Sequence, residues 1–307
     1  MTRFVSTKSV LLLLCVIVLG MAVAWVISAP TALTAKEVAT LPAGDAAKGE
    51  RLFWAGGCAS CHADPKATGD EKLRLGGGVE LHSPFGTFVA PNISPHKAEG
   101  LGAWSLSDFA NAMKRGVSPD GQHYFPAFPY TSYVNMRNQD VADLWAYLNT
   151  LEPVEIASKP HKVGFPFNIR RAVGFWKFLY FDPAPVQPTE AASDQIALGR
   201  YLVEALGHCG ECHTPRNGIG GPKADRWLAG GPSPEGDGTI PNITPHADGI
   251  GGWSVKDIVY SLETGFTPEF DSFGSSMTSV QQNMAKLTDQ DRQAIAAYLK
   301  SIPPLSN

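Results

Sequence analysis

Two copies of a five-residue pattern, Cys-x-x-Cys-His, constrain this chain more than any other feature of its sequence. They lie at Cys58–His62 and Cys209–His213. Two thiols one helical turn apart can each form a thioether with a haem vinyl group, and the next residue can turn its imidazole onto the iron. The pattern therefore predicts two covalently bound haem c groups. The residues expected to attach or ligate them are Cys58, Cys61, His62, Cys209, Cys212 and His213.

Paired cysteines also form zinc sites, so this alternative has to be weighed. A zinc site would have to bring both pairs to one ion, although Cys58 and Cys209 are 151 residues apart. Each motif also lies within its own repeat of surrounding sequence. Haem attachment is therefore favoured over a zinc ribbon or a thiol redox pair. The fifth cysteine, Cys15, falls in an apolar run and is expected to be inert.

An internal repeat organises the rest of the chain. Segments around the first motif recur around the second at an offset of 149 to 153 residues, which indicates a tandem duplication. We expect one domain at residues 41–155, a connecting segment at 156–190 and a second domain at 191–307. The matching segments are Gly49–Leu52 with Gly199–Leu202, Leu75–Gly78 with Leu228–Gly231, Pro91–His96 with Pro241–His246, Gly102–Ser105 with Gly251–Ser254, and Ala146–Leu148 with Ala297–Leu299.

Each copy is expected to consist of short helices joined by Gly- and Pro-rich loops, which gives an all-α fold. First helices are predicted at about Asp45–Ala55 and Asp194–Leu206. Ser105–Asp108 and Ser254–Asp257 are typical helix starts with an acid in the first turn, and Thr288–Asp291 is a capping box that opens the last helix. No segment shows the alternation of a β-strand over any length.

The connecting segment contains an apolar stretch, Ala172–Phe181. It is too short to cross a membrane, for which about 20 residues are needed. We expect a helix that packs against both domains. The alternative is a docking surface for a partner subunit.

The N-terminus carries a long apolar run, Val10–Ser28, preceded by Arg3 and Lys8. The run is long enough to cross a bilayer, and no convincing cleavage site follows it. We therefore expect residues 1–36 to be an uncleaved membrane anchor, with a cleaved signal peptide as the alternative. Positive charge before the span places the N-terminus in the cytoplasm and the haem domains in the periplasm, at the bacterial inner membrane.

The exported part of the chain is acidic. The sequence has 25 Lys and Arg against 29 Asp and Glu; three of the basic residues precede Glu37, so the remainder has 22 against 29 and a net charge of −7. Such a surface does not favour nucleic acid or anionic lipid, and it suits a basic docking patch on a protein partner. The charge can also serve solubility alone.

Three features together carry a resemblance: the Pro-Asn-Ile-[Ser/Thr]-Pro loops, the connector Phe165–Arg170 and the run Leu206–Asn217 around the second motif. The chain resembles the membrane-associated multihaem cytochrome c subunits of bacterial periplasmic dehydrogenases that oxidise alcohols, sugar acids, polyols or aldehydes. The resemblance implies tandem class I-like cytochrome c domains that pass electrons from a dehydrogenase catalytic subunit towards an oxidase or the quinone pool. Many such subunits carry three haems, whereas this chain has two motifs.

The resemblance also implies that a histidine and a methionine hold each iron. His62 and His213 come from the motifs. For the second haem the expected sixth ligand is Met277, with Met284 as the competitor. A thioether ligand has to come from a loop that faces the iron.

The sixth ligand of the first haem is less constrained by the repeat. Phe128 falls near the position that corresponds to Met277. Met136 is the expected ligand, and His123, which would give a bis-His haem of lower potential, is the alternative. Met113 corresponds to Leu262 in the second copy and is expected to be a core residue.

The remaining histidines are expected to be ordinary loop or surface residues: His82, His96, His161, His208 and His246. Three arginines, Arg170, Arg171 and Arg216, are candidates for contacts with haem propionates, with solvated surface positions as the alternative.

We expect an electron carrier and not an enzyme. A dihaem peroxidase would need an open iron, and a dihaem thiosulfate dehydrogenase resembles such a chain but has a Cys axial ligand. Cys15, the cysteine outside the motifs, lies on the wrong side of the anchor for that role. A haem-based gas sensor would need a five-coordinate iron and an output domain.

Overall fold

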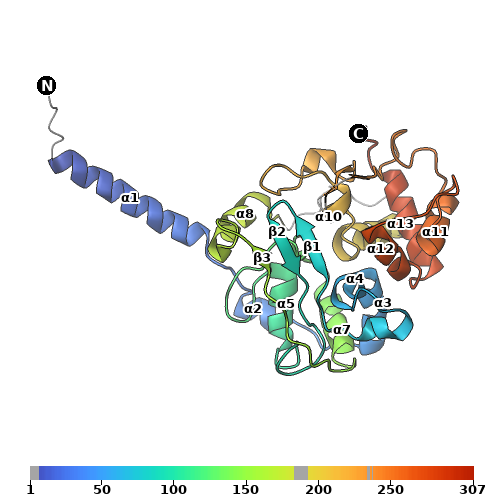
Figure 1. Ribbon diagram of the computed structural model, residues 1–307, viewed down its shortest axis with the longest axis horizontal. Coiled ribbons are helices and arrows are strands. Elements are labelled where there is room, and N and C mark those ends of the chain that lie inside the picture. The colour runs from blue at the N-terminus through green and yellow to red at the C-terminus, as the bar shows by residue number, and fades with distance from the viewer. Residues whose placement is uncertain (1–6, 183–192, 234–235, 237) are drawn as a thin grey trace.

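The computed structural model describes residues 7–182, 193–233, 236 and 238–307. Its most prominent element is a long helix, α1 (Thr7–Ile27), which projects from the rest of the chain (Figure 1). The segment Lys8–Ile27 has a mean hydropathy of 3.1, and none of it is buried in the protein. Twenty-one residues at about 1.5 Å each span about 31 Å, close to the thickness of a bilayer's hydrocarbon core. By length and composition, α1 can cross a membrane.

Each repeat is built on the crossing of its first and last helices. In the first domain α3 (Ala46–Ala55) packs against α7 (Asn138–Leu148), and in the second α9 (Asp194–Arg200) packs against α13 (Asp289–Ser301). A glycine lies at each crossing. A Cβ atom on Gly49 would come within 2.1 Å of the Asp143 carbonyl oxygen, and one on Gly199 within 1.9 Å of the Ala294 carbonyl oxygen. The glycines of the repeat therefore allow the two backbones to touch.

The expected helix starts are confirmed. Ser105 caps α5 (Leu106–Arg115), Ser254 caps α11 (Val255–Thr264) and Thr288 caps α13, each in a capping box with the acid three residues later. The predicted helix at Asp194–Leu206 is α9 continued by the π-helical turn η3 (Tyr201–Leu206). The remaining helices are α2 (Ala35–Ala39), α4 (Cys58–His62), α6 (Tyr130–Tyr133), α8 (Val173–Tyr180), α10 (Gly210–His213), α12 (Ser276–Met284), η1 (Gly69–Leu73), η2 (Arg170–Ala172) and η4 (Ala224–Arg226).

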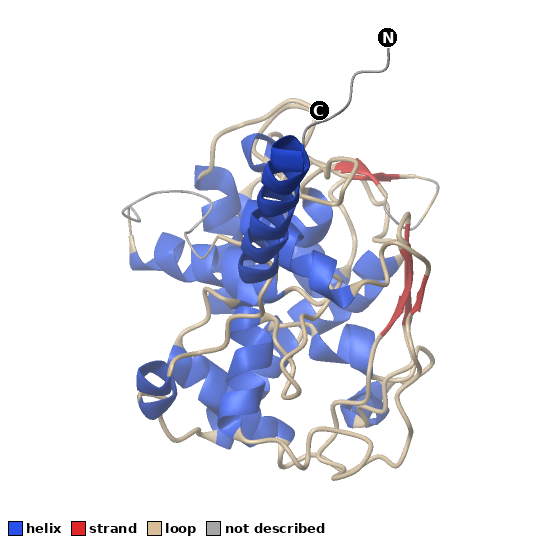
Figure 2. Cartoon of the chain, turned by 90° about the vertical axis from the view of Figure 1, so that its left-hand side faces the viewer, coloured by secondary structure: helices blue, strands red, loops and turns tan. Residues whose placement is uncertain are grey.

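The prediction of an all-α chain holds for the helical cores but not for their flank. β1 (Glu80–Ser83), β2 (Gly86–Val89) and β3 (Lys162–Val163) form an antiparallel sheet in the order β1-β2-β3, and β4 (Gly231–Pro232) pairs with β5 (Thr239–Ile240). Figure 2 shows these short strands at the edge of the helical body. They escape a search for alternation because each has four residues or fewer. The chain is mainly helical with two small sheets.

The connecting helix expected at Ala172–Phe181 is α8, and it contacts both domains. Lys177 Nζ donates to the carbonyl oxygens of Arg115 at 2.6 Å and Gly116 at 2.9 Å in the first domain. Trp176 Nε1 donates to the Ile219 carbonyl oxygen at 3.2 Å in the second. The expected boundary at residues 190 and 191 lies outside the described residues.

The two domains face each other across an approximate twofold relation between the repeats. Arg51 on α3 pairs with Asp291 on α13, with Nε at 2.8 Å from Oδ2. The repeat forms a second pair, from the second domain to the first: the hydroxyl of Tyr201 donates to Asp140. Tyr201 corresponds to Arg51 in the repeat, and Asp140 corresponds to Asp291. Each domain therefore contacts the start of the other domain's last helix through an equivalent position of the repeat.

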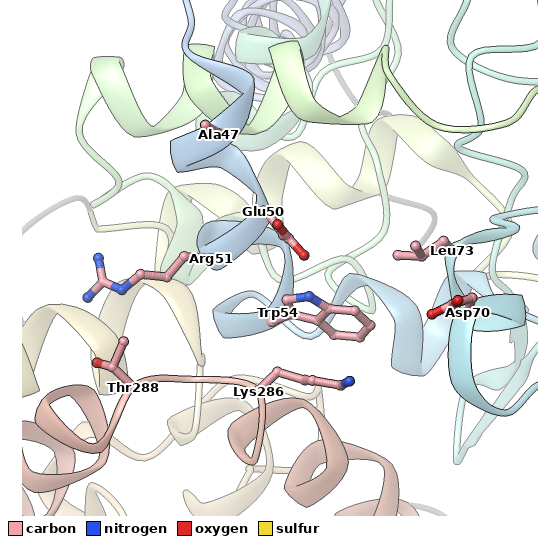
Figure 3. Close-up of a pocket in the computed structure, with 8 residues that line it drawn as sticks. All are labelled: Ala47, Glu50, Arg51, Trp54, Asp70, Leu73, Lys286 and Thr288. Atoms are coloured by element: carbon pink, nitrogen blue, oxygen red, sulfur yellow. The ribbon is translucent and has the colours of Figure 1, made fainter.

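A cavity of about 370 Å³ opens beside this interface (Figure 3). Trp54 lies at its centre, with Glu50 on one side and Lys286 of the second domain on the other. The Lys286 ammonium lies 5.6 Å from the Trp54 ring centroid. No thiol or imidazole of either motif lines this cavity. Its lining residues are Ala47, Glu50, Arg51, Trp54, Asp70, Leu73, Lys286 and Thr288.

Asp291 belongs to the capping box of α13 and also pairs with Arg51 across the domain interface. The stability of the folded protein is therefore expected to depend on pH. Burial alone would raise the pKa of the Asp291 carboxyl, but hydrogen bonds from Arg51 and Thr288 hold the pKa below its usual value of 3.8. This stabilisation is present above pH 3.8 and is lost as the pH falls through the lowered pKa. We expect Asp291→Asn to cost about 1 to 2 kcal/mol at neutral pH. Thermal unfolding followed by circular dichroism measures it.

The matched control is Asp289→Asn, which changes an exposed carboxyl of the same helix. It should leave the melting temperature close to that of the unmodified protein. The Asp291→Asn and unmodified proteins should converge as the solution is acidified below pH 3.8. Equal melting temperatures at neutral pH would contradict the stabilising role of Asp291.

Candidate haem centres

Each Cys-x-x-Cys-His motif forms a single helical turn, α4 or α10. The residue before the first cysteine of each motif has a left-handed backbone, Gly57 with φ of 65° and His208 with φ of 39°. The described cysteines are all free of disulfides. Burial raises the pKa of the Cys58 and Cys209 thiols to about 12. Each motif thus presents a pair of cysteines one turn apart, as thioether formation with a haem requires.

Both motif histidines are held in the same way. The Nδ1 atom of His62 lies 2.8 Å from the Pro91 carbonyl oxygen, and the Nδ1 atom of His213 lies 2.8 Å from the Pro241 carbonyl oxygen. Since a carbonyl only accepts, Nδ1 carries the proton and Nε2 keeps its lone pair. Burial lowers the pKa of both imidazoles, although these hydrogen bonds act in the opposite direction. A neutral imidazole with a fixed tautomer is what a metal ligand requires.

The loops that supply these carbonyls are pinned by asparagines. Asn92 Nδ2 donates to the carbonyl oxygens of Val154 at 2.7 Å and Ile156 at 2.9 Å, and its Oδ1 accepts from the Ser94 amide. In the second domain Asn242 Nδ2 donates to the Leu305 carbonyl oxygen at 2.7 Å. The repeated Pro-Asn-Ile-[Ser/Thr]-Pro sequence therefore fixes the position of the proline carbonyl in each copy.

A glycine seats each motif against its loop. The amide of Gly77 donates to the His62 carbonyl oxygen at 2.7 Å, and the amide of Gly230 donates to the His213 carbonyl oxygen at 2.7 Å. Both glycines have a positive φ, 74° and 71°. A Cβ atom on Gly77 would come within 2.5 Å of the Ala90 carbonyl oxygen, and one on Gly230 within 2.5 Å of the Ile240 carbonyl oxygen. No other residue fits without moving the loop.

The sulfur donors of the second domain occupy different environments. Met277 lies in the first turn of α12 and not in a loop, as was expected of a thioether ligand. It is partly exposed and is not part of the hydrophobic core. Met284, the last residue of α12, is buried in the core. Met284 therefore packs in the hydrophobic core, whereas Met277 does not.

The candidate ligands of the first domain are all buried. Met136 is 2% exposed and precedes α7 by two residues, the position that Leu287 occupies before α13. Met113 lies inside α5 and is part of the core, as its correspondence with Leu262 indicates. His123 is engaged elsewhere, because its Nε2 atom lies 3.0 Å from the carbonyl oxygen of Ser28 at the base of α1.

His208, which precedes the second motif, and Glu211, which lies inside it, form contacts that the sequence did not predict. His208, expected to be an ordinary loop or surface histidine, lies at the domain interface with its ring edge-on to that of Tyr133 at 5.6 Å between centroids. A Cβ atom on Gly57 would lie 4.0 Å from His208 Nε2. Glu211 accepts a hydrogen bond from Ser132 Oγ at 3.0 Å and pairs with Arg216. The one sequence signal for these contacts is the acidic side chain of Glu211 between the two cysteines of the motif.

The third residue of each motif contacts the opposite domain. Asn283 Nδ2 donates to Ser60 Oγ at 2.6 Å, and Ser132 Oγ donates to Glu211 Oε1. Ser60 and Glu211 are equivalent positions of the repeat, as are Ser132 and Asn283. The two attachment helices therefore face each other across the approximate twofold relation. This arrangement brings the two haem attachment points together.

The arginines proposed for haem propionates make contacts within the protein. Arg170 Nη1 donates to the His123 carbonyl oxygen at 2.9 Å, and Arg171 Nε donates to Ser28 Oγ at 2.9 Å. Arg216 Nη1 donates to the Gly220 carbonyl oxygen at 2.9 Å. Each of the three is thus held by the protein.

Paired thiols on one helical turn, followed by an imidazole with a fixed Nδ1 and a free Nε2, define a c-type cytochrome, and this chain has two such centres. A cytochrome c family model matches residues 46–152 and 196–303. The chain belongs to the cytochrome c family. It carries two covalently bound haem c groups and is an electron-transfer protein.

The similar proteins include dihaem cytochromes and dehydrogenase subunits. A diheme cytochrome c-type protein of Cereibacter sphaeroides is 54% identical over 262 residues, which is 85% of this chain and 87% of that protein. The fructose dehydrogenase cytochrome subunit of Gluconobacter japonicus is 37% identical over 83% of this chain and 52% of that protein. The gluconate 2-dehydrogenase cytochrome c subunit of Pantoea cypripedii is 34% identical over 83% of this chain and 59% of that protein. The chain thus spans little more than half the length of these two dehydrogenase subunits.

The contacts of Gly77 with the first motif and of Gly230 with the second can be tested separately, one haem at a time. Gly77→Ala pushes on the loop that carries the Pro91 carbonyl, so it weakens the hydrogen bond to His62 Nδ1. Loss of that bond makes the imidazole less basic and the reduced iron relatively more stable. We expect the midpoint potential of one haem to become more positive, while Gly230→Ala does the same to the other haem. Potentiometric titration followed by visible absorbance measures both.

The control variant is Gly78→Ala. Gly78 also has a positive φ, 103°, but a Cβ atom there would meet nothing within 4 Å. This variant therefore carries the backbone strain without the push on the loop. A shift as large in Gly78→Ala as in Gly77→Ala would show that strain, and not the loop contact, determines the potential.

Proposed function

We propose that this chain is a membrane-anchored carrier that receives electrons from a periplasmic dehydrogenase and passes them to the respiratory chain, at an oxidase or the quinone pool. The observation that supports it most directly is the pair of motif histidines, each fixed through Nδ1 and each presenting Nε2 to a haem iron. The haem supplies an iron that takes up and releases one electron. The protein supplies the ligands, the burial and the placement of the two centres.

The domain interface supports transfer between the two centres. Ser60 and Glu211 belong to the two motifs, and each is hydrogen-bonded to the opposite domain. The ring of His208, which precedes the second motif, contacts Tyr133 and lies beside Gly57, which precedes the first. These contacts hold the attachment helices in a fixed relation, so an electron can pass from one centre to the other without a domain motion.

We propose His213 and Met277 as the axial pair of the second haem. The partial exposure of Met277, outside the hydrophobic core, supports its assignment over Met284.

For the first haem we propose His62 and Met136. The hydrogen bond of His123 with Ser28 at the base of α1 counts against a bis-His haem. Met136 lies between α6 and α7, whereas Met113 lies inside α5. A residue between two helices can turn towards an iron at a lower cost than one in the middle of a packed helix.

The partner and the location rest on the relatives and on α1. The relatives named as cytochrome subunits of fructose and gluconate dehydrogenases support a dehydrogenase as the electron donor. The apolar helix α1, preceded in sequence by Arg3, supports anchoring in the inner membrane with the haem domains in the periplasm. The net charge of −7 beyond the anchor supports a donor with a basic docking patch.

The donor can be identified in membranes of the native host. Fructose and gluconate, which the names of the two dehydrogenase relatives contain, and a primary alcohol are added in turn, and haem reduction and oxygen uptake are recorded. We expect one substrate class to reduce both haems, and deletion of this chain to abolish oxygen uptake with that substrate. The unmodified chain should restore it, whereas His213→Ala should not. Rapid turnover of hydrogen peroxide by the purified protein would support the peroxidase alternative instead.

The axial ligands can be assigned with single methionine variants. We expect Met277→Leu to remove the methionine–iron charge-transfer band of one haem, because leucine has no donor atom. Met284→Leu should keep the band, since it changes a core side chain for one of similar volume. Near-infrared absorbance and magnetic circular dichroism of the oxidised protein provide the measurement.

The sixth ligand of the first haem can be tested with the same pair of variants, a candidate ligand and a core methionine. Met136→Leu should remove the second band, and Met113→Leu is its control. Loss of the band in Met113→Leu but not in Met136→Leu would overturn the assignment of Met136. A bis-His spectrum for one haem in the unmodified protein would favour His123.

A further inference from the structure

The connecting helix α8 carries an exposed apolar face. Phe175 is 42% exposed, Phe178 70% and Leu179 60%. Residues three and four positions apart share one face of a helix, so these three side chains form a single stripe. We call Phe175, Phe178 and Leu179 the α8 stripe. Exposed apolar side chains gathered in this way mark a contact surface.

The rest of α8 is fixed against the protein, so the stripe cannot turn inward. A Cβ atom on Gly174 would come within 2.4 Å of the Ser28 carbonyl oxygen, which shows how closely the helix approaches the end of α1. Lys177 donates to two carbonyl oxygens at the end of α5. The hydroxyl of Tyr180 accepts from Asn217 Nδ2 at 2.9 Å in the second domain.

α8 lies directly at the end of α1, where that helix would leave the membrane (Figure 1). The guanidinium of Arg171 lies 4.1 Å from the Trp25 ring centroid and donates to the Ser28 hydroxyl. Trp25 is 68% exposed. Tryptophan is enriched where a spanning helix passes from hydrocarbon to headgroups. Arg171 therefore ties the start of the connecting helix to the headgroup level of the bilayer.

We propose that the α8 stripe inserts into the periplasmic leaflet of the bilayer that α1 spans. The inference rests on the proposed anchoring of α1. Once α1 spans the bilayer, its contacts with Gly174 and Arg171 place α8 in the interfacial region. Apolar side chains of a surface helix are stabilised there by burial between headgroups and acyl chains. The stripe gives the protein a second membrane contact and fixes the tilt of its haem domains.

A bilayer is favoured over a protein partner as the occupant because of this continuity with α1. The chain leading into α8 adds further exposed apolar side chains, Phe165, Phe167 and Ile169. A soluble protein would have to enter the space between the haem domains and the headgroups in order to cover them. The acidic surface of the domains does not oppose the contact, since the charged residues directly before α8, Arg170 and Arg171, are both basic.

The test measures membrane depth at three positions of the full-length dihaem protein in vesicles of phosphatidylethanolamine and phosphatidylglycerol. The fluorophore NBD is attached to native Cys15, to Phe178→Cys and to Phe270→Cys, the last two in a Cys15→Ser background. Cys15 reports the anchor. Phe270 is the matched control, an exposed phenylalanine in the segment between α11 and α12. Iodide in the water and lipid nitroxides at two depths serve as quenchers.

We expect iodide quenching in Phe178→Cys to be several-fold weaker than in Phe270→Cys, and quenching by the shallow nitroxide to be strong. The label on Cys15 should respond to the deep nitroxide. Equal iodide quenching in Phe178→Cys and Phe270→Cys, with Cys15 shielded, would overturn the insertion of α8, leave the anchor intact and assign the stripe to a protein partner. A label on Cys15 that iodide reaches would overturn the anchor and the inference together. Leu179→Cys repeats the measurement at a second position of the stripe.

Discussion

The hydrogen bond between a motif histidine and a proline carbonyl is the interaction on which both centres depend. It fixes the tautomer, leaves Nε2 as the donor atom and sets the plane of the ring in each copy. Much of the surrounding loop serves this bond. Asn92 and Asn242 pin the segment that carries the carbonyl, and Gly77 and Gly230 let the backbone approach the end of the motif helix. The repeat thus duplicates the histidine together with the loop residues that hold it in place.

The duplicated domains associate through equivalent positions, but the chemistry at those positions has diverged. Arg51 and Tyr201 correspond, and each binds an aspartate at the start of the opposite last helix. Ser60 and Glu211 correspond as well, so one motif carries a neutral hydroxyl and the other a carboxylate. Burial alone would raise the pKa of Glu211, but Arg216 and Thr131 hold it below its usual value. The second motif therefore carries an ion pair, Glu211 with Arg216, where the first carries the Ser60 hydroxyl, so the two haems have unequal environments even though their histidines are held identically.

Local signals in the sequence were sufficient for the motifs, the repeat and the helix starts, because thiol spacing, capping boxes and glycines act over a few residues. Contacts between distant segments could not be predicted. The pairing of β2 with β3 joins residues more than 70 positions apart, and the strands are too short to show alternation. The sequence offers His123 as an alternative haem ligand, whereas its hydrogen-bond partner in the structure is Ser28, 95 residues earlier. Local sequence predicts an ordinary loop or surface residue at His208, because nothing local marks a domain interface. Met136 falls at the position of Leu287, which is apparent only once α7 and α13 are known to start two residues later.

The same long-range contacts make the two domains unequal with respect to α1. The first domain is joined to the end of that helix and to the segment that follows it by three kinds of interaction. These are the bond of His123 with Ser28, the Leu33 amide donating to Asn111 Oδ1 at 2.7 Å, and the ion pair of Glu37 in α2 with Arg115 at 2.7 Å. The second domain contacts α8 and lies on the side of the body away from α1 (Figure 1). A soluble protein therefore reaches the second domain without approaching the end of α1. An acceptor embedded in a membrane that α1 spans lies nearer the first domain. The opposed attachment helices at the interface connect these two sides of the molecule.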